Sequence, residues 1–98
     1  MFLPETWRAE VQAVIDRRVP TDVDVFVFGS RAHGRCLKPY SDLDLCLKGA
    51  SALPTATLSA IDEAFRDSDL PIRVDVVDWH AINAEFREMI AADLMPWR

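Results

Sequence analysis

The sequence has few of the residues that mark secreted, zinc-binding or membrane-spanning proteins. Its 98 residues include only two cysteines, Cys36 and Cys46, which form neither a disulfide framework nor a zinc-binding pattern and which we interpret as ordinary thiols. Apolar runs such as residues 25–28 are too short to cross a bilayer. The N-terminus has no basic segment ahead of an apolar stretch, so we expect no secretory signal, no membrane association and a cytoplasmic location.

Basic residues are in the minority, so we expect no generic binding to DNA or RNA. The chain has 16 acidic and 11 basic residues and a formal net charge of −5. Residues 25–41 nevertheless contain no acid, although they contain Arg31, Arg35 and Lys38. This stretch is either a site for an anionic ligand or a solvated basic loop.

The remaining composition is that of a globular domain. Half of the residues are apolar and 28% are charged, which excludes a disordered or fibrous chain. No repeat, linker or low-complexity segment interrupts the sequence, so we expect a single domain over residues 1–98.

Hydrophobic periodicity predicts three helices and three strands. Helical spacing of apolar residues covers positions 7–15, with Pro20 closing the segment, and recurs over residues 54–67 and 82–94, the last ended by Pro96. Strand patterns cover residues 23–28, 42–48 and 72–78. The order helix, strand, loop, strand, helix, strand, helix predicts an α/β (α+β) fold. We expect a two-layer sandwich in which helices cover one face of a small mixed β-sheet.

Two short patterns carry candidate chemistry. Gly29 and Ser30 directly follow the first predicted strand, where a glycine permits close approach to a ligand and a short helical start binds phosphate. Asp42 and Asp44 are two residues apart on the next strand and therefore point to the same side, with Cα atoms about 6–7 Å apart. Such a pair suits divalent cations, although a half-exposed strand often carries acids without a ligand.

A third acid is chosen by strand parity. Val74 and Val76 have the core-facing pattern, so Asp75 should point away from the core, on the same side as the first two acids. Asp78 has the opposite parity and is interpreted as a surface or helix-entry residue.

Together, residues 29–35, 41–45 and 74–78 resemble the nucleotidyltransferase superfamily that includes DNA polymerase β. The resemblance is strongest to its minimal members, the MNT proteins, which pair with HEPN-domain proteins. It extends from Val23 to the C-terminal helix. One departure is the spacing between Ser30 and Asp42, where eleven residues stand, one more than is usual for the family.

The resemblance implies transfer of a nucleoside monophosphate, AMP from ATP, onto a hydroxyl with release of pyrophosphate. In this interpretation Asp42, Asp44 and Asp75 are catalytic and bind two Mg²⁺ ions, for which Mn²⁺ can substitute. Gly29, Ser30 and Arg31 bind the nucleotide. The implied acceptor is a HEPN-domain partner, with this chain as the antitoxin of a toxin–antitoxin pair; a homo-oligomer stays open.

Two further interpretations belong to other classes. The chain could be a non-catalytic module that neutralises or scaffolds a partner by contact, or a transferase acting on a small molecule. Retention of all three acids and of the Gly-Ser pair favours the enzyme.

Overall fold

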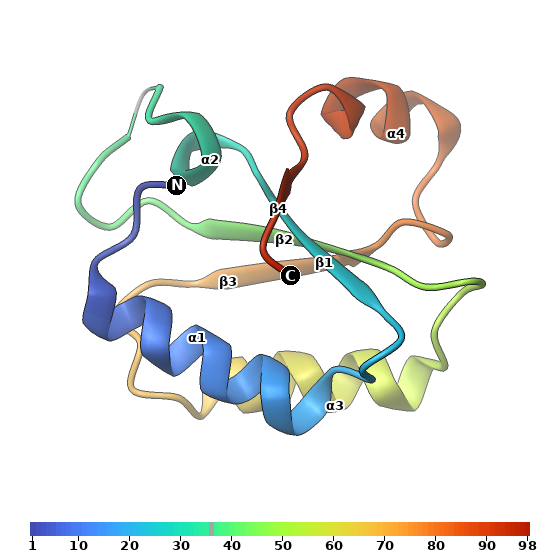
Figure 1. The fold of residues 1–98 in the computed structure, drawn as a ribbon, viewed down its shortest axis with the longest axis horizontal. Coiled ribbons are helices and arrows are strands. Elements are labelled where there is room, and N and C mark those ends of the chain that lie inside the picture. Colours follow the sequence, from blue (N-terminus) through green and yellow to red (C-terminus); the bar gives the residue numbers. More distant parts are fainter. Residues whose placement is uncertain (36) are drawn as a thin grey trace.

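A mixed β-sheet forms the centre of the computed structural model, which describes residues 1–35 and 37–98 (Figure 1). The interpretation of Cys36 as an ordinary thiol lies outside the described residues. The elements follow in the order α1 (Glu5–Arg18), β1 (Asp24–Phe28), α2 (Ser30–His33), β2 (Leu43–Lys48), α3 (Thr55–Arg66), β3 (Val74–Asp78), α4 (Ala84–Ala91) and β4 (Met95–Pro96).

The sheet has four strands in the order β3-β2-β1-β4. β1 pairs antiparallel with both β2 and β4, whereas β2 and β3 run parallel. A parallel pair needs a crossover connection, and α3 supplies it between β2 and β3. The predicted small mixed sheet within an α/β fold is therefore confirmed.

One face of the sheet is covered by α1 and α3, which lie side by side beneath it in Figure 1. Val11, Val14 and Ile15 of α1 are completely buried there. They pack against alternate residues of the strands and against α3 in one core that includes Val25, Val27, Leu43, Leu45, Leu47, Ile61 and Phe65. Alternation along each strand therefore leaves the intervening residues on the opposite face.

The opposite face is covered in part by α4. Phe28 and Cys46 of the sheet pack against Ile90, and Phe86 meets the Phe28 ring edge-to-face with the ring centres 6.2 Å apart. We expected the three predicted helices on one face, but α4 lies across the sheet from α1 and α3 (Figure 1). The reason is the apolar side chain of Phe28, which needs its own cover on the face away from the main core.

Two elements depart from the sequence-based expectations. Pro96 was expected to end the last helix, but α4 ends earlier and Pro96 belongs to the short edge strand β4, paired with Phe26. A proline is tolerated there because an edge strand does not require its N–H. Residues 30–33 form the short helix α2, which begins at Ser30 as the short helical start expected there, although the predicted order of elements counted this stretch as a loop. In the described part of the chain, no helix is both long and apolar enough to cross a membrane.

The buried centre of β2 should govern stability. Leu45 is fully buried and stands between Val27 and Val76 in the strand register. We expect Leu45→Ala to lower the free energy of unfolding by about 2–5 kcal/mol, because it removes packed methyl groups and leaves a cavity. Urea denaturation measures this loss. The control Met89→Ala, at a side chain that is 72% exposed, should change stability by less than about 0.5 kcal/mol, and equal losses would contradict the assigned core.

Candidate active site

Asp44 and Asp75 stand next to each other on neighbouring strands. The parallel register of β2 and β3 pairs them directly, and paired strands are about 4.8 Å apart. Asp42 lies immediately before β2, two residues from Asp44, and is close enough for its charge to repel that of Asp44. The three acids that the sequence singled out are therefore brought to one region of the sheet face opposite α1 and α3.

The turn after β1 presses against this acidic group. Gly29 has φ 75° and ψ −158°, a backbone conformation that is essentially restricted to glycine. A Cβ on Gly29 would lie only 2.6 Å from Asp44 Oδ2. The turn therefore places the start of α2, and with it Ser30, directly beside the Asp44 carboxylate.

The acidic group has a marked electrostatic effect on Asp44. Burial, followed by repulsion from Asp75 and Asp42, raises the pKa of Asp44 to about 6, and Arg73 opposes this in part. Ionisation of Asp44 therefore costs free energy in the folded protein, and a cation bound to the carboxylate would offset that cost.

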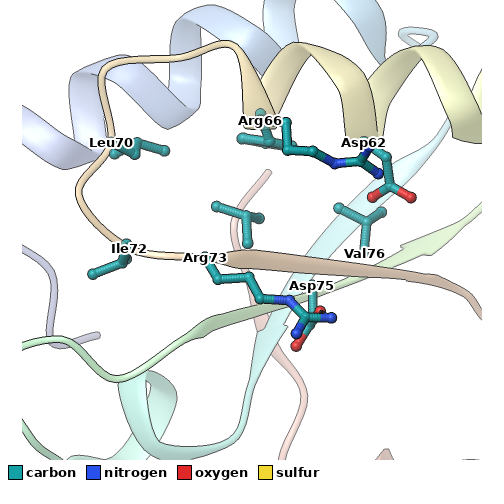
Figure 2. A pocket seen from close by; sticks show the side chains of 9 residues that line it. Asp62, Arg66, Leu70, Ile72, Arg73, Asp75 and Val76 are labelled. Atoms are coloured by element: carbon teal, nitrogen blue, oxygen red, sulfur yellow. Dashed lines mark ion pairs between the residues drawn. The ribbon is translucent and has the colours of Figure 1, made fainter.

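Asp75 has a partner that sequence reasoning missed. Arg73 Nη2 lies 2.9 Å from Asp75 Oδ1, and the Arg73 side chain is 75% exposed. Figure 2 shows both side chains on one side of β3, while Val76 points to the other side, toward α3. The signal was available, because residues two apart on a strand share a face.

A cavity of about 410 Å³ opens between α3 and the outer edge of β3 (Figure 2). Asp62 and Arg66 of α3 line it together with Asp75 of β3 and Arg73, which lies immediately before β3. Asp75 thus stands at the border between this cavity and the sheet face that carries Asp44.

The carboxylates of Asp42, Asp44 and Asp75 are suitable ligands for a divalent cation, although they do not form a tight cluster. Among the described residues, no group of three or more His, Cys, Asp or Glu side chains is already arranged to hold a metal ion, and Asp75 is paired with Arg73 instead. Two observations support the fit. Carboxylate oxygens are the ligands that Mg²⁺ prefers, and the missing Cβ of Gly29 leaves room beside Asp44.

The side chain of Arg31 points away from the three carboxylates. Its guanidinium is 3% exposed and donates to the backbone carbonyls of Phe2, Pro39 and Ser41 at 2.9–3.1 Å. It also stacks on the Trp7 ring, 5.4 Å from its centre. The structure therefore does not bring the Arg31 side chain to the carboxylates. Instead, it fixes the loop that leads into Asp42.

The interpretation of Asp78 as a surface residue is wrong. It is only 3% exposed, and its carboxylate accepts hydrogen bonds from the Leu53 N–H at 2.7 Å and the His80 N–H at 3.0 Å. A buried carboxylate needs such donors. Asp78 therefore anchors the loop before α3 to the end of β3 and stands apart from the three acids.

His33 of α2 and Cys46 of β2 lie on elements that form this region, and neither joins the acidic group. His33 Nε2 of α2 lies 3.4 Å from Asp93 Oδ1, so α2 contacts the segment after α4. Cys46 shares the face of Asp44, but it is completely buried beneath α4. Burial, together with the nearby Asp78, raises the pKa of the Cys46 thiol to about 11, with Lys48 opposing, so this thiol is unreactive near neutral pH.

This fold is that of a nucleotidyltransferase. The family profile described as nucleotidyltransferase domain matches residues 9–97, so the chain belongs to that family, as a minimal nucleotidyltransferase domain, and is an enzyme of that class. The chain is 43% identical over 82 residues to "Probable protein adenylyltransferase MntA" of Haemophilus influenzae, an alignment covering 84% of this chain and 70% of that protein.

Solved structures share the fold. A crystal structure of a toxin–antitoxin with AMP-PNP superposes with a TM-score of 0.72 at 17% identity, covering 91% of this chain and 70% of the other. A mutant of the toxin–antitoxin MntA-HpeT gives a TM-score of 0.69 at 13% identity, with the same coverage. The predicted nucleotidyltransferase fold is thereby confirmed.

Because its pKa is raised, Asp44 should make stability depend on pH. In the unfolded chain this carboxyl ionises near its ordinary value of 3.8, but in the folded chain it ionises near 6. The folded state therefore loses stability as the pH rises from about 4 to about 6. We expect Asp44→Asn to melt at a higher temperature than the wild type at pH 7, with the difference shrinking to nothing below pH 4.

Thermal melts across this pH range measure the effect. Asp24→Asn, at the exposed start of β1, is the control for removing one negative charge. A melting-temperature advantage of Asp44→Asn that is equally large at pH 3.5 and pH 7 would contradict the raised pKa.

Any side chain at Gly29 should destabilise the fold for steric reasons. We expect Gly29→Ala to lower the free energy of unfolding by about 1–3 kcal/mol, because the new Cβ would adopt a strained conformation and crowd the Asp44 carboxylate. Chemical denaturation measures the loss. Gly49→Ala is the matched control, since a Cβ there would meet its nearest atom at an ordinary 3.4 Å. Equal costs at the two positions would contradict the tight turn.

Proposed function

We propose that this chain transfers AMP from ATP to a hydroxyl group on a HEPN-domain partner protein, as the antitoxin of a toxin–antitoxin pair. The observation that carries the proposal is the direct pairing of Asp44 with Asp75 beside the Gly29 turn. The name of the Haemophilus influenzae relative, a protein adenylyltransferase, supports AMP as the group transferred. The toxin–antitoxin crystal structure with AMP-PNP supports ATP as the donor and a toxin as the partner.

The carboxylates have separate tasks in this proposal. Asp42 and Asp44 would hold two Mg²⁺ ions, which Mn²⁺ could replace, and Asp75 would complete the second site. The bound ions would neutralise the triphosphate and lower the pKa of the attacking hydroxyl. Asp75 is half-buried and faces the site, so it also receives the proton that the hydroxyl gives up.

The turn after β1 orients the nucleotide. Gly29 and Ser30 bind the β- and γ-phosphates through the Ser30 hydroxyl and the N–H groups at the start of α2, which lack partners within the helix. Arg31 contributes its N–H there, while its side chain holds the loop before Asp42 in place. The acceptor oxygen forms a bond to the α-phosphorus, the bond to the β-phosphate breaks, and pyrophosphate leaves.

We also infer that residues 1–98 act as one minimal domain in the cytoplasm. The main core runs from Val11 of α1 to Trp97 after β4, so both ends of the chain contribute to a single unit.

The central test follows labelled AMP. The chain is incubated with ATP labelled at the α-phosphate, Mg²⁺ and the proposed HEPN-domain partner. We expect label on that partner, and a loss of at least about a hundredfold in Asp44→Asn and Asp75→Asn, because these acids organise the charge at the reacting phosphate. Asp24→Asn, distant along β1 and exposed, should label the partner at the wild-type rate.

Two results would overturn the proposal. Labelling that persists in both acid variants would remove the catalytic role of the carboxylates. A partner that binds tightly but stays unlabelled, with no ATP consumed, would identify the chain as a non-catalytic binding module.

A further inference from the structure

A second cavity lies away from the carboxylates, between the N-terminal segment and the loop before β2. Its volume is about 590 Å³, and Phe2, Trp7, Leu37, Lys38 and Tyr40 are among the residues that line it. Trp7 packs against the core beneath the sheet, on the side of α1 and α3. Asp42, Asp44 and Asp75 are not among the described residues that line this cavity.

The walls of this cavity are held in place. The Phe2 N–H donates to the Arg31 carbonyl at 2.7 Å, and the Arg31 guanidinium donates to the Phe2 carbonyl at 2.9 Å. The same guanidinium bonds the Pro39 carbonyl in the loop at 3.1 Å. One buried arginine thus ties both walls of the cavity together, so the cavity is formed before any partner arrives.

Two of the three large apolar residues that are exposed in the described chain lie in this cavity. Tyr40 is 72% exposed and Phe2 is 49% exposed, although large apolar side chains are usually covered. Lys38 is exposed at the rim, and neither aspartate nor glutamate is among the described residues of the lining. In a chain of net charge −5, this region is suited to a partner that presents negative charge beside apolar side chains.

The loop also links the cavity to the reaction site. Tyr40 lines the cavity and only Ser41 separates it from Asp42, so the loop that forms one wall of the cavity leads directly into the first of the three acids. We propose that this cavity docks a segment of the acceptor protein that presents an acidic residue beside apolar side chains, and so holds the acceptor next to the loop that leads into the carboxylates. The proposal rests on the proposed function for the identity of the acceptor.

Two single substitutions test the docking. Tyr40→Ala removes the exposed ring, and Lys38→Glu reverses the charge at the rim. Met89→Ala is the matched control for an exposed apolar side chain, and Arg17→Glu, on α1, for a reversed charge. For each variant, calorimetry measures the affinity for the HEPN-domain protein without nucleotide, and separately the affinity for ATP with Mg²⁺.

We expect each cavity variant to bind the HEPN-domain protein about tenfold more weakly, with ATP affinity changed less than twofold, and both controls to match the wild type. Because all four side chains are exposed, melting temperatures should be unchanged. Higher salt should weaken partner binding more in the wild type than in Lys38→Glu, since a charge contact is screened.

Other outcomes separate the two proposals. If both cavity variants bind the partner as tightly as the wild type, or if the wild type does not bind it, the docking proposal is wrong. If only ATP affinity falls, the cavity holds part of the nucleotide and the docking proposal is also wrong. If partner binding depends on the cavity but no AMP is transferred, docking stands and the proposed function fails.

Discussion

The parallel pairing of β2 with β3 is the constraint on which the acidic site depends. It sets Asp44 directly beside Asp75, and it forces Leu43, Leu45, Val74 and Val76 into the main core. Slipping the register by one residue would send the acids into that core and the apolar residues to the surface. The packing of α1 and α3 under the sheet therefore stabilises the fold and also fixes which face carries the carboxylates.

The opposite face is divided between packing and chemistry. Toward the end nearest α4, Phe28 and Cys46 are covered by Phe86 and Ile90. Where α4 does not reach, Asp44 stays partly accessible, and its partial burial, followed by repulsion from Asp75 and Asp42, raises its pKa. Helix α4 thus leaves one part of the face open, and the turn at Gly29 forms the border of that opening.

Strand alternation and the Gly-Ser pair were readable from the sequence because both are local. The period of two along residues 42–48 and 72–78 assigned Asp44 and Asp75 to one face before any coordinates. The position of α4, the strand at Pro96 and the roles of Arg31 and Asp78 could not be read in that way. Each depends on contacts between distant segments: Arg31 bonds the carbonyl of Phe2, and Asp78 bonds the N–H of Leu53.

The measurement that tests the account most directly is a titration with Mn²⁺ followed by electron paramagnetic resonance. It compares the wild type with Asp75→Asn and Asp78→Asn, two acids only three residues apart on β3. The account predicts that Asp75→Asn weakens Mn²⁺ binding at least about tenfold, while Asp78→Asn leaves the affinity of the folded protein unchanged. Equal affinity in the wild type and Asp75→Asn, or a loss confined to Asp78→Asn, would contradict it.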